Sequence, residues 1–266
     1  MIHVGTSGFS YQDWEGPFYP PGIPARDKLG YYARVFDTVE VDSSYYGIPK
    51  ASTLAAMAAK TPPGFLFSLK AFQGMTHARE DNAALFQQFN HALIPWVEQE
   101  RLGCVLAQFP SSFRNTPANR DYLRLLRERM GDIPTVVEFR HRDWITESTF
   151  ILLRDQGLGF CCVDQPRLQS LVPPVAVVTS PIGYVRFHGR NAQKWWHHEH
   201  AWERYDYTYS RDELAPWVPK IRQLAESSRA TFVYANNHWE GQAIDTARQL
   251  RLLLGLDAPS SPAAAK

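Results

Sequence analysis

The chain has 266 residues, of which 44% are hydrophobic and 21% are charged, and 28 lysines and arginines nearly balance 27 aspartates and glutamates. This is the composition of an ordinary globular protein, and a net charge of +1 disfavours extended nucleic-acid binding, which usually needs a basic face. The start has no basic-then-apolar leader pattern, and no segment approaches the roughly 18 apolar residues of a membrane span. We therefore expect a cytoplasmic protein whose partner is a small-molecule substrate or ligand.

Cysteine usage agrees with that compartment. Cys104, Cys161 and Cys162 stand in apolar stretches without C-x-x-C spacing. An odd number of cysteines without that spacing favours a reducing cytosol over a disulfide framework. Free cysteine is among the most buried residue types, so we interpret all three as core residues rather than as nucleophiles or metal ligands.

Short apolar or alternating runs bounded by Gly, Pro, Asn or Asp recur along the chain, which is the pattern of buried strands. Eight strands are predicted, at Ile2–Thr6, Val39–Asp42, Leu66–Lys70, Cys104–Gln108, Thr135–Glu138, Gly159–Val163, Gly183–Phe187 and Thr231–Tyr234. Helical patterns separate most of them, at Lys28–Val35, Ser52–Lys60, Asn82–Glu100, Arg120–Met130, Glu147–Gln156, Asp212–Ser227 and Gln242–Leu254. Asn119 and Ser210 are predicted helix caps, and the interval 164–182, with four prolines, has no helical pattern.

Strict alternation of strands and helices predicts parallel strands joined by right-handed crossovers. Eight such units in this length predict an α/β fold, a single (β/α)8 TIM-barrel-like domain over residues 1–256, followed by a disordered tail at 257–266. The competing fold is a doubly wound open sheet, but neither the G-x-G-x-x-G nor the G-x-x-x-x-G-K-[ST] fingerprint is present. The sequence therefore names no cofactor, and Gly5-Thr6-Ser7-Gly8 is only a weak turn for an anion.

Functional side chains of such barrels gather at the carboxyl ends of the strands. Period-two spacing places the charged side chains of the predicted strands on the inner face, because the outer face must be apolar to pack against helices. The predicted site residues at these ends are Ser7, Glu40, Asp42, Tyr45, Lys70, His77, Gln108, Glu138, Arg140, His141, Asp164, Arg186, His188, Asn236 and Asn237. Their charges nearly cancel, so a purely structural ion network is the alternative interpretation.

Residue chemistry suggests a role for each member. Glu138 and His188 are the preferred proton carriers, with the pKa of Glu138 set by burial and by neighbouring cations. Arg140 and Arg186 suit bidentate capture of a carboxylate or phosphate. Asn236, Gln108 and Tyr45 would orient hydroxyl groups.

Lys70 has two interpretations, and both keep it in the catalytic set with Glu40. It could be a Schiff-base nucleophile, which requires a depressed pKa. Pairing of the Lys70 ammonium with the Glu40 carboxylate is the favoured interpretation.

Two further features keep alternatives open. His77, His141, His188 and His238 with Glu138 and Asp164 offer nitrogen and oxygen ligands for zinc or manganese, although no H-E-x-x-H spacing is present and no metal is predicted. The interval 195–209 is crowded with Trp, Tyr and His, including Trp195. We interpret this tract as an aromatic lid or ligand-stacking surface over the barrel mouth, with a packed loop as the alternative.

A set of motifs along the chain resembles those of a known family. The motifs, in chain order, are Val4-Gly5-Thr6-Ser7-Gly8, Gly16-Pro17-Phe18-Tyr19-Pro20, Val39-Glu40-Val41-Asp42-Ser43-Ser44-Tyr45-Tyr46, Phe67-Ser68-Leu69-Lys70, Gln108-Phe109-Pro110, Val137-Glu138-Phe139-Arg140-His141, Val185-Arg186-Phe187-His188-Gly189 and Asn236-Asn237. Together they closely resemble the uncharacterised domain-of-unknown-function 72 family, also called the YecE-like family. The resemblance covers the chain to about Leu254 and implies a TIM-barrel-related fold, but it implies no activity. The family commonly has Thr-Phe-Tyr-Arg where this chain has Ser44-Tyr45-Tyr46-Gly47, so a positive charge is missing there.

These observations lead to one functional expectation and two alternatives. We expect an enzyme of the hydrolase, isomerase or lyase type that acts by general acid/base chemistry on a small polar, anionic or sugar-like substrate at the barrel mouth. The alternatives are a metal-dependent hydrolase or isomerase, acting on phosphodiesters for example, and a non-catalytic barrel that binds a small molecule.

Overall fold

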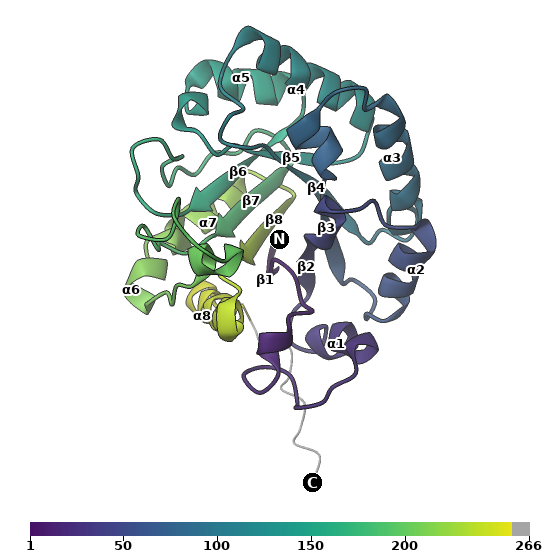
Figure 1. Ribbon diagram of the computed structural model, residues 1–266, viewed down its shortest axis with the longest axis vertical. Coiled ribbons are helices and arrows are strands. Elements are labelled where there is room, and N and C mark those ends of the chain that lie inside the picture. Colours follow the sequence, from purple (N-terminus) through teal and green to yellow (C-terminus); the bar gives the residue numbers. More distant parts are fainter. Residues whose placement is uncertain (257–266) are drawn as a thin grey trace.

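The computed structural model describes residues 1–256, and the tail predicted at 257–266 lies outside the described residues. Eight strands form one sheet, and all pairs within it are parallel (Figure 1). They are β1 (Ile2–Thr6), β2 (Thr38–Val41), β3 (Leu66–Lys70), β4 (Leu102–Gln108), β5 (Thr135–Glu138), β6 (Gly159–Asp164), β7 (Ile182–Phe187) and β8 (Ala230–Ala235).

The sheet curls into a nearly closed barrel. Neighbouring strands follow the order β1-β8-β7-β6-β5-β4-β3-β2. β1 and β2 are joined by an isolated bridge between Ser7 and Glu40, where the Gly8 amide donates to the Glu40 carbonyl over 2.7 Å. The arrangement is TIM-barrel-like, so the predicted fold class is confirmed.

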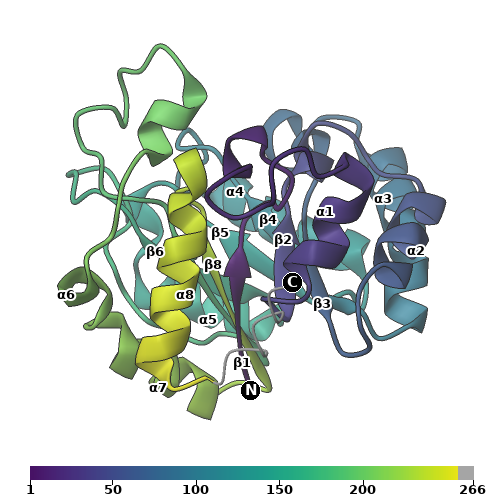
Figure 2. The same ribbon diagram turned by 90° about the horizontal axis from the view of Figure 1, so that it is seen from below.

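Helices cover the outside of the barrel, as the two views at right angles show (Figures 1 and 2). They are α1 (Ala25–Tyr32), α2 (Ala51–Ala59), α3 (Ala83–Glu98), α4 (Pro117–Met130), α5 (Glu147–Asp155), α6 (Arg211–Leu214), α7 (Trp217–Glu226) and α8 (Gln242–Leu254). The β6–β7 connection contains no helix, as its prolines predicted, and within residues 1–256 no helix is long and apolar enough to cross a membrane.

Several predicted helices differ in their bounds by one to three residues, and two of the differences have a clear cause. α4 begins at Pro117 because the Thr116 hydroxyl caps it by accepting from the Asn119 amide, so Asn119 lies inside the helix and is not its cap. The helix predicted over 212–227 is two helices, α6 and α7, with Pro216 between them. Ser210 caps α6 as predicted.

The strand faces carry different chemistry. Val39, Val137 and Phe139 are buried on the outer face, and the Phe139 ring stacks on Trp144 with 4.3 Å between ring centroids. The inner face is polar: Tyr234 contacts both the Thr38 hydroxyl, at 2.6 Å, and the Ser68 hydroxyl, at 3.0 Å, across the barrel. Polar residues of this inner face continue to the strand ends, where they border a cavity.

Candidate active site

A cavity of about 640 Å³ opens at the carboxyl ends of the strands. Most of the predicted site residues meet there. Those that line it are Asp42, Tyr45, Lys70, His77, Gln108, Arg140, Arg186, Trp195 and Asn236. Ser7, Glu40, Glu138 and His188 are fully buried and in contact with the residues that form its floor.

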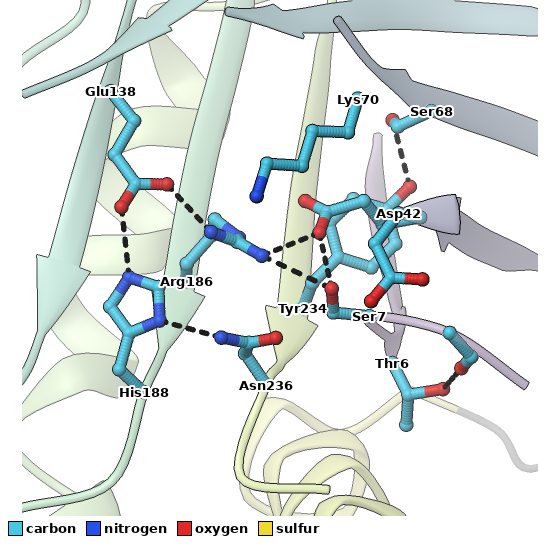
Figure 3. A network of polar contacts seen from close by, with 12 residues as sticks. Thr6, Ser7, Asp42, Ser68, Lys70, Glu138, Arg186, His188, Tyr234 and Asn236 are labelled. Atoms are coloured by element: carbon cyan, nitrogen blue, oxygen red, sulfur yellow. Dashed lines mark hydrogen bonds and ion pairs between the residues drawn. The ribbon is translucent and has the colours of Figure 1, made fainter. Parts of the chain in front are cut away.

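Arg186, at the end of β7, is the centre of the floor (Figure 3). Its Nη1 donates to Glu138 Oε2 over 2.7 Å, and its Nη2 donates to Glu40 Oε1 over 2.7 Å and to Ser7 Oγ over 3.1 Å. The side chain is only 2% exposed, and its Nε has no hydrogen-bond partner among residues 1–256. A single guanidinium thus holds together strands β1, β2, β5 and β7.

Glu138 is surrounded by donors. Besides Arg186, its Oε1 contacts Arg140 Nε at 2.9 Å and His188 Nε2 at 3.1 Å. Burial opposes ionisation, but Arg140, Arg186 and His188 together outweigh it and hold the pKa of Glu138 well below its usual range. Glu138 is therefore a permanent carboxylate at neutral pH and is poorly suited to carry a proton.

His188 is also fixed in one protonation state. Burial and the charge of Arg140 lower the pKa of His188 to about 3, so the ring is neutral. A neutral imidazole has one donor and one acceptor: Nε2 donates to Glu138, and Nδ1 accepts from Asn236 Nδ2 over 2.9 Å. With both nitrogens engaged and the side chain fully buried, His188 orients Glu138 rather than facing a ligand.

Glu40 and Ser7 complete the floor from β2 and β1. Ser7 Oγ donates to Glu40 Oε1, and Tyr184 donates to Glu40 Oε2 over 2.5 Å. The partner of Glu40 is therefore Arg186, and the predicted Lys70–Glu40 pair is wrong, because the inward guanidinium reaches the carboxylate instead. The amides of Ser7 and Gly8 donate to Ala235 and Glu40 carbonyls, so this turn offers no cradle for an anion.

Lys70, at the end of β3, has no carboxylate partner among the described residues. Its Nζ lies 4.5 Å from the ring centroid of Tyr45, a cation–π distance. Burial and the charge of Arg186 lower the pKa of Lys70, against weaker opposing effects of Tyr205 and Glu138. Burial, Lys70 and Arg140 likewise lower the pKa of neighbouring His77 to about 4.

The segment between β7 and α6 covers part of the cavity. It contributes Trp195, Trp196, Arg204 and Tyr205 to the lining. The Arg204 guanidinium lies 5.4 Å from the Trp195 ring centroid, its Nε is buried without a hydrogen-bond partner, and within residues 1–256 it forms no ion pair. Burial alone would raise the pKa of Tyr205, but Arg140, Lys70 and Arg204 lower it below its usual value.

Three predicted site residues lie elsewhere. Asp164 points outward from β6 and not into the barrel: it accepts from Arg190 Nε and Nη2, both at 2.8 Å, in a pair covered by Tyr209 and Trp217. Asn237 donates to the Tyr207 carbonyl over 2.8 Å and to Thr246 of α8 over 3.0 Å. His141 contacts Asp143 at 3.0 Å and lines a separate shallow groove.

Their neighbours explain these positions. Successive residues of a strand point to opposite faces, and Asp164 shares the face of Cys162, whose Sγ lies 3.7 Å from the Val177 carbonyl outside the barrel. Asn237 follows Asn236, which is directed inward, and so faces α8. In both places, the alternation along the strand and just beyond its end decides which face the side chain takes.

Lining residues that the predicted set lacked come from loops. Tyr11 follows β1 and hydrogen-bonds Asp42 Oδ2 over 3.2 Å, and its ring stacks on His238 with 4.5 Å between centroids. Arg204 and Tyr205 lie in a short 3-10 helix, Ala201–Tyr205. Only the aromatic richness of that interval signals its involvement, because loops have no periodicity from which to place a side chain.

The described residues contain one group of three side chains placed to share a metal ion, formed by Glu199, His200 and Glu203. It lies in the β7–α6 segment, and Glu203 already pairs with Lys194 at 2.7 Å. The strand-end histidines considered as metal ligands are not part of it. The site is therefore better described by its cations than by a metal-ligand set.

Comparison with known proteins agrees with this architecture. The family model described as "Protein of unknown function DUF72" matches residues 3–266. The chain is 34% identical over 273 aligned positions to the UPF0759 protein YunF of Bacillus subtilis (strain 168), covering 97% of this chain and 96% of the relative.

Two solved structures are similar over their whole length. The DUF72 family protein TM1631 of Thermotoga maritima MSB8 is 38% identical with a TM-score of 0.88, covering 96% of this chain and 99% of its own. The DUF72 family protein EF0366 of Enterococcus faecalis V583 is 27% identical with a TM-score of 0.85, covering 97% and 96%. As its motifs predicted, the chain belongs to the DUF72 family.

Proposed function

We propose that the protein is a cytoplasmic enzyme that binds a small anionic substrate in the cavity at the barrel mouth. The observation that carries this proposal is an excess of cations there. Four cations line the cavity, and we call them the cavity cations: Lys70, Arg140, Arg186 and Arg204. Asp42 is the one carboxylate that lines the described cavity, and Glu40 and Glu138 below it are already paired with Arg186.

Two of the cavity cations await a counterion. Arg140 and Arg186 share Glu138, whereas Lys70 and Arg204 form no ion pair within residues 1–256. An uncompensated charge away from water is unfavourable, so an anionic ligand would be stabilised where these two approach the cavity. A guanidinium also matches the planar geometry of a carboxylate or the edge of a phosphate.

The ionisable groups indicate how chemistry would proceed. Glu138 and His188 are fixed as carboxylate and neutral imidazole, so we assign them to orient Arg186 and Arg140 rather than to transfer protons. Lys70 has a lowered pKa and faces the cavity, so it becomes the proposed proton carrier. Tyr45 and Gln108 line the same space and would orient hydroxyl groups, and Trp195 and Trp196 would pack against an apolar or sugar-like part of the substrate.

Calorimetric titration with inorganic phosphate and citrate at low ionic strength tests the binding step. We expect saturable binding that weakens roughly 10- to 100-fold in Arg204→Gln, the loss expected for one hydrogen bond to a charged group. Arg124→Gln, on the exposed surface of α4, is the matched control and should bind as wild type does. No binding to either anion, or equal binding by Arg204→Gln, would refute the anion site.

Turnover is a separate outcome. If anionic carbonyl and sugar compounds bind and are recovered unchanged after long incubation, the protein is a non-catalytic binding barrel and the proposed enzymatic activity is refuted. The proposed compartment is supported by the cysteines, because Cys104, Cys161 and Cys162 are all unpaired and buried.

A further inference from the structure

We infer that Lys70 is an amine nucleophile that forms an imine with the carbonyl carbon of an anionic aldehyde or ketone. This inference rests on the proposed anion site and names the substrate class that the site would take. It assigns a covalent step to a lysine that the ion network of the floor leaves out (Figure 3).

The position of Lys70 meets the first requirement, which is access without competition. Its Nζ contacts the Tyr45 ring at 4.5 Å and donates no hydrogen bond within residues 1–256, and the side chain lines the cavity. Three lysines elsewhere are occupied: Lys28 pairs with Glu15 at 3.0 Å, Lys194 with Glu203, and Lys220 donates to the Pro174 carbonyl over 2.6 Å. Among the lysines that line the described cavity, Lys70 stands alone.

The surroundings favour the second requirement, which is a larger neutral fraction of the amine than an exposed lysine has. The charged and titratable groups that face Lys70 are Arg186 from β7, Arg140 and Glu138 from the end of β5, His77 after β3, and Tyr205 from the β7–α6 segment. The one carboxylate among them is Glu138, and it is already engaged by Arg140, Arg186 and His188. A like-charged neighbourhood favours the amine over the ammonium.

The arginines meet the third requirement, which is orientation. Arg140, Arg204 and Lys70 line the same cavity and all act on Tyr205, so an anionic group held by the two arginines would keep an adjacent carbonyl in the space that Lys70 faces. Holding two reacting groups together in this way converts a bimolecular addition into an intramolecular one. The same arrangement disfavours uncharged aldehydes, which the arginines do not retain.

The step balances without any other reactant. The Nζ lone pair forms a bond to the carbonyl carbon, the π pair moves to oxygen, and the proton lost from nitrogen ends on that oxygen to give a carbinolamine. The nitrogen lone pair then forms the C=N bond as the C–O bond breaks, and the oxygen leaves as water after taking up a proton, for which we assign the Tyr205 phenol as donor because it also lines the cavity. Addition of water reverses the sequence and restores Lys70.

Borohydride trapping tests the inference. Full-length protein is incubated with pyruvate or with glyceraldehyde 3-phosphate, reduced with sodium borohydride, and analysed by intact mass and peptide mapping. We expect one reduced adduct per chain, mapped to Lys70, for at least one of the two probes, and competition by inorganic phosphate. Mapping on the wild-type protein makes the result independent of whether any variant folds.

Two variants sharpen the result. Lys70→Arg keeps the positive charge but cannot form an imine, so its adduct should be lost, whereas Lys50→Arg, at an exposed position, should be labelled as wild type is. Adducts spread over surface lysines, or none with either probe, overturn the inference. If calorimetry still shows phosphate binding in that case, the anion site stands and only the imine falls; if both measurements fail, the proposed function falls too.

Discussion

Two clusters of buried charge lie on opposite sides of the barrel wall. The inner cluster is Arg186 with Glu40 and Glu138, and the outer cluster is Asp164 with Arg190. In the outer cluster, the carboxylate accepts from two guanidinium nitrogens, from the Tyr209 hydroxyl at 2.6 Å and from Trp217 Nε1 at 2.7 Å. The inner cluster is also held by ion pairs, but it borders a cavity lined by more cations than carboxylates. Both are ion pairs, but within residues 1–256 only the inner cluster stands beside cations that have no carboxylate partner, Lys70 and Arg204, and that difference supports the proposed anion site.

The largest expected effect comes from removing the hub of the inner cluster. Arg186→Met leaves Glu40 and Glu138 buried without their shared cation, so we expect the free energy of unfolding to fall by about 3–5 kcal/mol. Urea unfolding followed by circular dichroism measures it. Adding Glu138→Gln to this variant should recover part of the loss, and a change of less than about 1 kcal/mol in the single variant would contradict the assignment.

The outer cluster provides the contrast. Asp164→Asn keeps an acceptor for only one of Tyr209 and Trp217, which donate to different carboxylate oxygens, and removes the charge beside Arg190, whose side chain is 26% exposed, so we expect a loss of about 1–3 kcal/mol. Phosphate titration should be unchanged, because Asp164 does not line the cavity. A tenfold weaker phosphate affinity would show that the two clusters are not independent.

Acid should weaken the inner cluster through His188. Its folded pKa of about 3 lies below the ordinary 6.5, so between these values the unfolded chain binds a proton that the folded protein refuses. The free energy of unfolding therefore falls as the pH drops through 6.5, with a contribution from this ring of up to about 1.4 kcal/mol per pH unit. Urea unfolding from pH 8 to pH 4 measures the slope.

The variant His188→Gln separates the contribution of His188 to the pH dependence of unfolding from that of the other titratable groups. The glutamine amide can donate to Glu138 and accept from Asn236 without titrating, so its slope should be shallower than that of wild type. Comparison at pH 8, where the wild-type ring is neutral in both states, gives the cost of the substitution itself. Identical slopes for the two proteins would contradict a neutral His188.

The smallest effect is expected on the surface. Arg124 and Asp121 form an exposed i,i+3 pair on α4 at 2.7 Å, with side chains 51% and 75% exposed. Solvent screens such a pair, so Arg124→Gln should change the free energy of unfolding by no more than about 0.5 kcal/mol in the same urea assay. A loss close to that of Asp164→Asn would mean that burial does not distinguish these ion pairs.

The sequence predicted most of the fold and the floor of the site because both follow strand periodicity. Glu40, Glu138 and Arg186 alternate with apolar residues that must face helices, so their inward direction could be inferred from pattern alone. The inward position predicted for Asp164 was wrong, because the partner that stabilises it outside the barrel, Arg190, lies in the β7–α6 segment, where no pattern indicates it.

Pairing and loop placement are harder to infer. Lys70 and Glu40 stand on adjacent strands, but Arg186 reaches the carboxylate from across the barrel, a choice that depends on side-chain length and direction rather than on order in the chain. Arg204 and Tyr205 belong to a long connection without periodicity, and only their three-dimensional positions place them over the cavity. The ion-pair partner of Glu40 and the positions of Arg204 and Tyr205 therefore depend on contacts between segments far apart in the sequence, which the hydrophobic pattern does not contain.

The pairing of β1 with β8 has a consequence for synthesis on the ribosome. Ile2 lies opposite Thr231 and Thr6 opposite Ala235, while β1 meets β2 through a single isolated bridge. During synthesis β1 emerges first, but it gains a continuous partner strand only when β8 has emerged. Until then both edge strands of the incomplete sheet, β1 among them, have unpaired backbone groups. We expect nascent chains that stop before Ala230 to depend on chaperones, because neither end of the sheet can yet be covered by the other.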